Sequence, residues 1–126
     1  MSWDSYVDTL KNQHHIARSA IVSRAGDSVW ASSSDFKLSP TELSEIAQAF
    51  DNPTRVLSSG VHANGQKFFT LSADDRVIRA QRNQDGIIAV RTKQAIIISN
   101  YDEKVLANSA STSTEKLADY LIKSGY

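Results

Sequence analysis

The stretch from Gln66 to Asn100 constrains the fold most, because it reads as four strands joined by very short links. Alternating or β-branched-rich patterns predict strands at residues 66–73, 76–82, 87–92 and 95–100. The links between them span two to four residues. Such links suit antiparallel hairpins, whereas a parallel crossover needs about a dozen residues or more. The stretch therefore predicts an antiparallel meander.

Two details of this meander follow from its residue types. The link at residues 83–86 ends in Asp-Gly, a strong signal for a hairpin turn. Alternate residues of a strand face the same side of a sheet. One buried face is therefore expected to consist of Ile88, Val90, Ile96 and Ile98.

A helix start precedes the meander. Ser39 can cap the helix, Pro40 suits the first helical position, and Glu42 can complete a capping box. An apolar stripe follows at helical spacing and consists of Leu43, Ile46, Ala47 and Phe50. Pro53 is expected to end this helix, since the residue before a proline avoids the helical region.

The N-terminal stretch places two large aromatic side chains on a predicted helix. Ser2 is a good N-cap, and Trp3 and Tyr6 are neighbours on one helical face. Val7 and Leu10 extend an apolar stripe beside them. Chain ends usually fray, so aromatics of this size either dock the helix on the core or form a binding surface.

A last helix is predicted from residues 112–115, Thr-Ser-Thr-Glu, which read as a second capping box. Its core face is expected to consist of Leu117, Ala118, Leu121 and Ile122. Tyr120 falls beside that face, free to line a groove, and Gly125 can close the helix. Upstream, the apolar runs at 20–22 and 29–31 predict a short β-hairpin.

Together these elements predict an α+β fold with helices packed on an antiparallel sheet. The 126 residues are expected to form a single domain, 1–126. With no cysteine, the chain cannot form disulfides or use thiol chemistry. No apolar run approaches ~18 residues and no secretory signal is visible, so a cytoplasmic location is expected.

No set of residues predicts catalysis, a metal site or a cofactor. Residues 60–67 fail as a phosphate-binding loop, because Gln66 intervenes and Phe68 replaces the required hydroxyl. The adjacent His14 and His15 cannot both face one metal from a regular helix. A small-molecule sensor or catalytic domain remains the competing interpretation, and it requires an enclosed pocket with convergent polar groups.

The net charge is zero, but the charges are unevenly spread. Residues 67–93 hold six Lys/Arg against three Asp/Glu, whereas residues 1–66 hold five against seven. This local excess suggests a surface for an anionic partner. A nucleic-acid partner is not expected, because the chain as a whole is neutral.

Seven fragments, in order along the whole chain, combine into a specific pattern. They are Met1-Ser2-Trp3 with Tyr6, Ser23 to Asp27 with Val29-Trp30-Ala31, Phe50 to Pro53, Gly65 to Phe68, Ala73 to Arg76, Val90 to Gln94, and Leu117 to Leu121. In this combination the chain resembles the profilins, most closely those of fungi. The resemblance implies a non-enzymatic protein with both terminal helices on one sheet face and a further helix on the other. It also implies three partners: monomeric actin, proline-rich proteins such as formins, and phosphoinositide membranes.

The resemblance places the proline-rich site in a groove between the terminal helices. Its residues are Trp3, Tyr6, Trp30, Tyr120, Leu121 and Tyr126. Polyproline II segments present flat rings at little entropic cost, and aromatic-lined grooves accept them. Tyr and Trp donors can bond the peptide carbonyls, since proline has no N–H to compete.

The resemblance places the actin surface on the later strands and the start of the last helix. Its residues here are Lys67, Phe69, Leu71, Arg76 and Arg79. The chain departs from the family at Ser72, where many relatives carry arginine, and at residues 108–112, which lack the usual glycine and lysine. A serine cannot replace the fork of donors of an arginine. Actin binding is therefore expected to be weakened or compensated by Arg79 and Arg82; an adaptor that keeps only the proline-rich function is the alternative.

The candidate phosphoinositide site is the basic group of residues 67–93. It consists of Lys67, Arg76, Arg79, Arg82, Arg91 and Lys93. Each basic residue near an anionic membrane contributes about 1 kcal/mol. The group overlaps the expected actin surface, so the two ligands are expected to compete.

Overall fold

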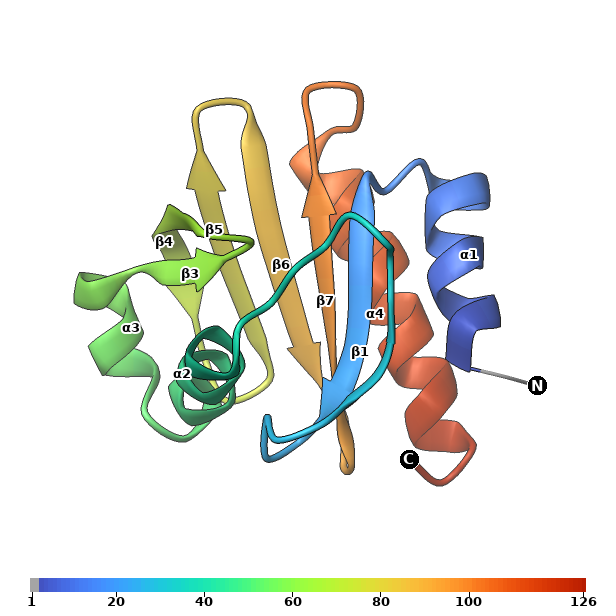
Figure 1. Cartoon of the computed structure of the whole chain (residues 1–126), viewed down its shortest axis with the longest axis horizontal. Helices are drawn as coiled ribbons and strands as arrows, with labels where there is room; N and C mark the ends of the chain where they lie inside the picture. The colour runs from blue at the N-terminus through green and yellow to red at the C-terminus, as the bar shows by residue number, and fades with distance from the viewer. Residues whose placement is uncertain (1–2) are drawn as a thin grey trace.

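The computed structural model of the chain describes residues 3–126, and its centre is one antiparallel sheet (Figure 1). The strand order is β2-β1-β7-β6-β5-β4-β3. The strands are β1 (Arg18–Ser23), β2 (Val29–Ser32), β3 (Val61–Ala63), β4 (Gln66–Ala73), β5 (Val77–Arg82), β6 (Asp85–Arg91) and β7 (Ala95–Tyr101). The helices are α1 (Trp3–His14), α2 (Pro40–Asp51), α3 (Pro53–Ser59) and α4 (Ala107–Lys123). The predicted meander is confirmed as β4 to β7.

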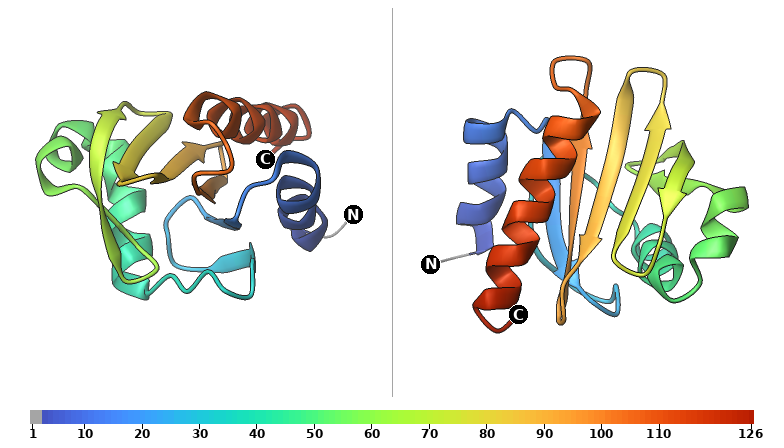
Figure 2. Two further views of the ribbon diagram at one scale, coloured as in Figure 1. Left: turned by 90° about the horizontal axis from the view of Figure 1, so that it is seen from above. Right: turned by 180° about the vertical axis from the view of Figure 1, so that it is seen from behind.

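Helices cover both faces of the sheet (Figure 2). On one face α1 and α4 enclose a core that includes Leu10, Ile97 and Leu121. On the other, α2 lies over a core that includes Phe50 and Ile98, and α3 lies against β4. The expected α+β arrangement, with the terminal helices on one face and a further helix on the other, is confirmed. Between Trp3 and Tyr126, no helix is long and apolar enough to cross a membrane.

The central strands β6 and β7 are buried on both faces, so the predicted single buried face is wrong. Residues directly opposite each other in an antiparallel pair share a face, and Val90 pairs with Ile97 whereas Ala89 pairs with Ile98. Ile88 and Val90 therefore face α1 and α4, while Ile96 and Ile98 face the α2 side. The predicted alternation within each strand is correct. The pairing register of β6 with β7 decides which residues of the two strands share a face.

The start of α2 follows the sequence signal closely. The Ser39 hydroxyl accepts from the Glu42 N–H at 3.1 Å, and the Glu42 carboxylate accepts from the Ser39 N–H at 2.9 Å. The other carboxylate oxygen accepts from the Gly65 N–H at 2.9 Å, which ties α2 to the β3–β4 turn. Pro53 ends α2 as predicted, but it also opens α3, because its fixed φ suits a first helical position.

The predicted start of the last helix is wrong. The helix α4 begins at Ala107, after Leu106, and no side chain caps it. Thr114 instead lies buried inside the helix, where its hydroxyl donates to the Ala110 carbonyl at 2.8 Å and lies 2.8 Å from the Ser99 hydroxyl. The expected cap Ser2 of the first helix lies outside the described residues.

The Asp-Gly signal also has a different role from the expected one. Arg82 pairs with Asp85, so the hairpin loop is Asn83-Gln84, with Asn83 at φ 55°. Gly86 lies within β6, and a Cβ there would stand 2.1 Å from the ring of Tyr101. The glycine is required for this close approach of backbone and ring, and not for the turn.

Candidate functional site

The terminal helices α1 and α4 lie side by side (Figure 2). Aromatic rings gather around the start of α1. The Trp3 ring is the centre of this aromatic cluster. Its centroid lies 4.8 Å from that of Trp30 on β2 and 4.9 Å from that of Tyr126, beyond α4. Three segments far apart in the sequence therefore meet at one indole ring.

Tyr6 continues the cluster one turn along α1. Its ring centroid lies 5.7 Å from that of Trp3 and 6.0 Å from that of Tyr120 on α4. Burial, followed by the hydrogen bond and charge of Tyr120, raises the pKa of the Tyr6 hydroxyl. This hydroxyl therefore stays protonated at neutral pH and can donate a hydrogen bond to a peptide carbonyl.

The rings of the aromatic cluster remain open to solvent while the layer beneath them is closed. Tyr120 and Tyr126 are 48% and 39% exposed, and Trp3, Tyr6 and Trp30 are half-buried. The layer beneath consists of Val7, Leu10 and Leu121. The structure thus brings five of the six predicted residues together at the surface and places the sixth, Leu121, under them as support.

Tyr126 is fixed in place by backbone bonds. Gly125, at φ 98°, turns the chain back so that the Tyr126 N–H donates to the Leu121 carbonyl at 2.9 Å. The Tyr126 backbone oxygen accepts from the Gln94 N–H at 2.6 Å and from the Thr92 hydroxyl at 2.9 Å. Both donors lie at the β6–β7 link, which in the sequence is only a tight turn. No local pattern points from that turn to Tyr126.

A second exposed surface, the outer surface, is formed by β4 with β5 and α4 beside it. Phe69 and Leu71 of β4 are 67% and 58% exposed. Phe68, on the same strand, instead points into the core and is buried. The Lys67 ammonium nitrogen lies 5.7 Å from the centroid of the Phe69 ring, a cation–π distance. The outer surface therefore presents large apolar side chains that nothing in the described chain covers.

Two arginines of the outer surface are held against α4. Arg79 lies directly opposite Ser72 in the β4–β5 register, and one of its guanidinium nitrogens is 3.4 Å from the Glu115 carboxylate. Arg76 makes an ion pair with Asp119, one turn further along α4. The structure therefore brings the predicted strand residues together with α4 and identifies Glu115 and Asp119 as their partners, which the sequence alone does not.

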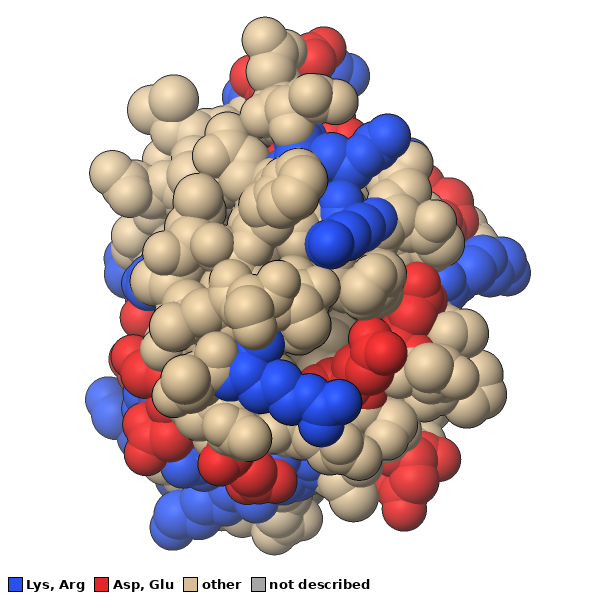
Figure 3. Space-filling model, turned by 90° about the vertical axis from the view of Figure 1, so that its left-hand side faces the viewer, with Lys and Arg blue, Asp and Glu red and all other residues tan. Residues whose placement is uncertain are grey.

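The six basic residues expected to bind lipid headgroups do not form one group. Arg76 adjoins Arg91, whose N–H donates to the Arg76 carbonyl at 2.9 Å, and Lys93 follows in the next link. Arg82 and Lys67 lie toward the opposite end of β5 and β4, about 20 Å from Arg76 along the strand. The sixth residue, Arg79, lies midway along β5. Figure 3 shows basic side chains on this side of the molecule separated by uncharged and acidic ones.

The chain is similar over its whole length to proteins of one known family. The family model described as Profilin matches residues 1–126. The Saccharomyces cerevisiae profilin is 48% identical over 97% of both chains, and the Schizosaccharomyces pombe profilin is 47% identical over the full length of both. A crystal structure of the latter superposes with a TM-score of 0.95 over 99% of this chain and 100% of its own. A mouse profilin IIa in complex with a double repeat from the FH1 domain of mDia1, at 20% identity and a TM-score of 0.81, has the same fold.

Proposed function

The chain belongs to the profilin family, and from that premise we propose that it binds proline-rich segments and monomeric actin at two separate surfaces. Profilins are actin-binding proteins that regulate polymerisation, and no enzymatic activity is indicated for them. The proline-rich ligand is assigned to the aromatic cluster and actin to the outer surface. We propose that residues 1–126 act as a single profilin domain in the cytoplasm, associated with the cytoskeleton.

The aromatic cluster carries the first assignment. Proline rings pack well on flat aromatic faces, and a polyproline II segment loses little entropy on binding. The protonated Tyr6 hydroxyl and the indole N–H of Trp3 can each donate to a peptide carbonyl. The mouse relative seen with FH1 repeats supports formin-type segments as the ligand class.

Isothermal titration with a proline decamer tests this assignment. Binding with a change in Trp3 and Trp30 fluorescence is expected, and a glycine–serine peptide of equal length is the control. Heat from both peptides alike, or from neither, would refute the assignment. A ligand that stays bound through purification would instead favour the sensor interpretation.

The exposed apolar side chains of the outer surface carry the second assignment. Phe69 and Leu71 provide a hydrophobic centre, and Lys67, Arg76 and Arg79 surround it with positive charge. Because Arg79 lies opposite Ser72, its guanidinium can serve the carboxylate that an arginine at position 72 would otherwise meet. This supports the compensation hypothesis over a loss of actin binding.

A pyrene-actin sequestration assay tests the second assignment. Suppression of spontaneous polymerisation at micromolar protein is expected. No measurable binding at tens of micromolar protein would leave the alternative, an adaptor for proline-rich ligands with lost actin binding. Neither result depends on the proline decamer, so the two assignments fail independently.

Phosphoinositide headgroups are a second candidate ligand for part of the basic group. The adjacency of Arg76 and Arg91, with Lys93 beyond, favours a site at that end of the sheet. Both arginines are already partnered, by Asp119 and by Asp75, and this limits the attraction for a headgroup. Vesicle flotation at physiological salt is the test: retention that does not depend on phosphoinositide content would rule the site out.

A further inference from the structure

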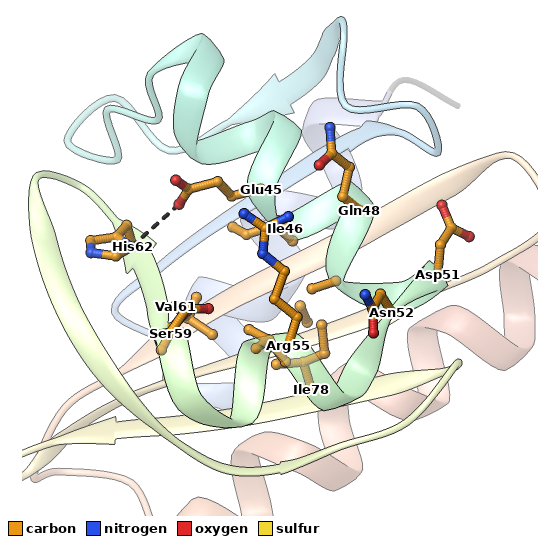
Figure 4. A pocket seen from close by; sticks show the side chains of 14 residues that line it. Glu45, Ile46, Gln48, Asp51, Asn52, Arg55, Ser59, Val61, His62 and Ile78 are labelled. Atoms are coloured by element: carbon orange, nitrogen blue, oxygen red, sulfur yellow. Dashed lines mark hydrogen bonds and ion pairs between the residues drawn. The ribbon is translucent and has the colours of Figure 1, made fainter.

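A pocket lies on the face of the sheet opposite the aromatic cluster, between α2, α3 and β3 (Figure 4). Its volume is about 320 Å³, at the small end of the range of ligand pockets, about 300–1,000 Å³. The chain turns at Asn52-Pro53, so that α2 ends and α3 begins there, and the pocket lies between the two helices. None of the residues assigned to the two proposed ligand surfaces lines it.

The floor of the pocket is apolar and already ordered. Ile46 and Ala49 of α2, Val56 of α3 and Ile78 of β5 line it, and each is 6% exposed or less. These side chains belong to the core, so they need no rearrangement to receive a ligand. An apolar body of modest size would therefore bury its surface here at little conformational cost.

Two carboxylates at the rim of the pocket each lie beside a nitrogen-bearing side chain. The Glu45 carboxylate lies 3.3 Å from Nδ1 of His62, and the Asp51 carboxylate lies 2.8 Å from the Arg24 guanidinium. Arg55 stands among them, and across residues 3–126 no hydrogen bond or ion pair engages its guanidinium. Figure 4 shows its side chain extending from α3 across the mouth of the pocket toward α2. The mouth thus holds a guanidinium, a planar fork of N–H groups, whose donors have no partner in the described part of the chain.

We propose that this pocket binds a small carboxylate with a short apolar body, whose carboxylate pairs with Arg55. A guanidinium pairs with a carboxylate through two parallel N–H···O bonds, which fixes both orientation and charge. The side-chain amide of Asn52, also at the rim, can supply a further donor. The apolar body of the ligand lies on Ile46, Ala49 and Val56. A ligand therefore needs both a carboxylate and an apolar body to bind well.

A backbone NMR titration with octanoate, octan-1-ol and octylamine tests the proposal. Octanoate is expected to shift the amide signals of α2, α3 and β3 with millimolar or better affinity, and the alcohol and the amine to bind roughly tenfold more weakly or less. Signals of the aromatic cluster are expected to stay in place. No shift around the pocket with octanoate up to about 10 mM, or equal binding of all three probes, would overturn the proposal.

Two variants and a matched control extend the test. Arg55→Gln is expected to weaken octanoate binding roughly tenfold while leaving octanol unchanged, because the guanidinium is exposed and makes no ion pair within residues 3–126. The octanoate affinity of Arg55→Lys is expected to lie between those of Arg55→Gln and the unsubstituted protein, since lysine keeps the charge without the planar fork of donors. Lys104→Gln, in the link between β7 and α4, removes one positive charge elsewhere and is expected to leave binding unchanged.

The same variants distinguish a protein ligand from a small molecule. If octanoate does not bind and Arg55→Gln instead weakens actin sequestration, the pocket is part of a protein interface and the small-carboxylate proposal is wrong. Octanoate binding that is equal in Arg55→Gln and the unsubstituted protein would also overturn it. Ala49→Leu, which adds bulk to the floor, is expected to abolish binding of octanoate and octanol alike if it folds.

Discussion

The aromatic cluster and the outer surface differ in how their side chains are engaged before any ligand arrives. In the cluster, Trp3 is packed against Trp30 and Tyr126, and no charged side chain is part of it. On the outer surface, the arginines are paired with acidic residues of α4, while Phe69 stands 67% exposed. One surface is pre-assembled from rings; the other combines uncovered apolar groups with charges that already have partners.

This difference sets what each surface must do on binding. A peptide that packs on preformed rings pays little for ordering them, so each ring contributes most of its contact energy. A partner of the outer surface must replace the contact of Arg79 with Glu115, which offsets part of any new ion pair. We therefore expect single substitutions to have larger effects in the cluster than on the outer surface.

The largest expected effect comes from Trp3→Ala. Because Trp3 contacts rings from β2, α1 and the end of the chain, its loss removes the centre of the cluster. Affinity for a proline decamer is expected to fall about 100-fold or more by isothermal titration, with actin sequestration nearly unchanged. A parallel loss of both activities would mean that Trp3 serves the core and not a ligand.

Phe69→Ala is expected to act on the other surface only. Removing a ring that is 67% exposed leaves the core intact, so stability is expected to change by less than about 0.5 kcal/mol. Actin affinity in the pyrene assay is expected to fall roughly 10- to 30-fold, and decamer binding to stay constant. Val29→Ala, at an exposed apolar position on the opposite edge of the sheet, is the matched control. An unchanged actin affinity would remove β4 from the proposed interface.

Ser72→Arg is expected to increase actin affinity by up to about tenfold. The new guanidinium adds donors for a partner carboxylate, although its repulsion from Arg79 directly opposite offsets part of the gain. Ser72→Glu is the charge-reversed control and is expected to weaken binding. If Ser72→Arg leaves actin affinity unchanged, Arg79 already pairs with the partner carboxylate. That result would favour compensation by Arg79 over weakened actin binding.

Asp74→Asn is expected to have the smallest effect, a decrease in the free energy of unfolding. Asp74 lies in the link before β5, beside the outer surface. Hydrogen bonds from the N–H groups of Val77 and Arg76 hold the pKa of Asp74 below its usual range, aided by Arg79. A lowered pKa in the folded state means that its stabilisation is present above the unfolded pKa and is lost as pH falls through the folded one.

Urea unfolding at several pH values tests this expectation. At pH 7 the variant is expected to be less stable by about 0.5 kcal/mol, since solvent screens the exposed carboxylate, and the difference is expected to shrink as the solution is acidified below about pH 4. A Trp3→Ala protein measured in parallel is expected to keep its full acid dependence, because none of the rings that Trp3 contacts belongs to an Asp or Glu side chain. A constant difference between pH 3 and pH 7 would contradict the role given to the Asp74 carboxylate.

Most secondary structure was predictable because its signals are local. The capping box of Ser39 and Glu42, the alternation of β4 and the short links need only a few neighbouring residues to act. The membership of the aromatic cluster followed from the resemblance to the profilins, except that Leu121 lies beneath the rings and not among them. The hydrogen bonds from Thr92 and Gln94 that hold Tyr126 in place could not be predicted, because they join a tight turn to a residue far away in the sequence.

The sequence by itself determined most of the strands and helices, although not α3 or β3, and it placed large aromatics at both ends of the chain. Tertiary structure decided the rest: the faces of Ile88 and Ile98, the start of α4, the pairing of Arg79 with Glu115, and the pocket beside Arg55. The physical reason is the range of the interactions. Caps, alternation and turns are settled within a few residues, whereas register, ion pairs between elements and cavities depend on how distant segments pack.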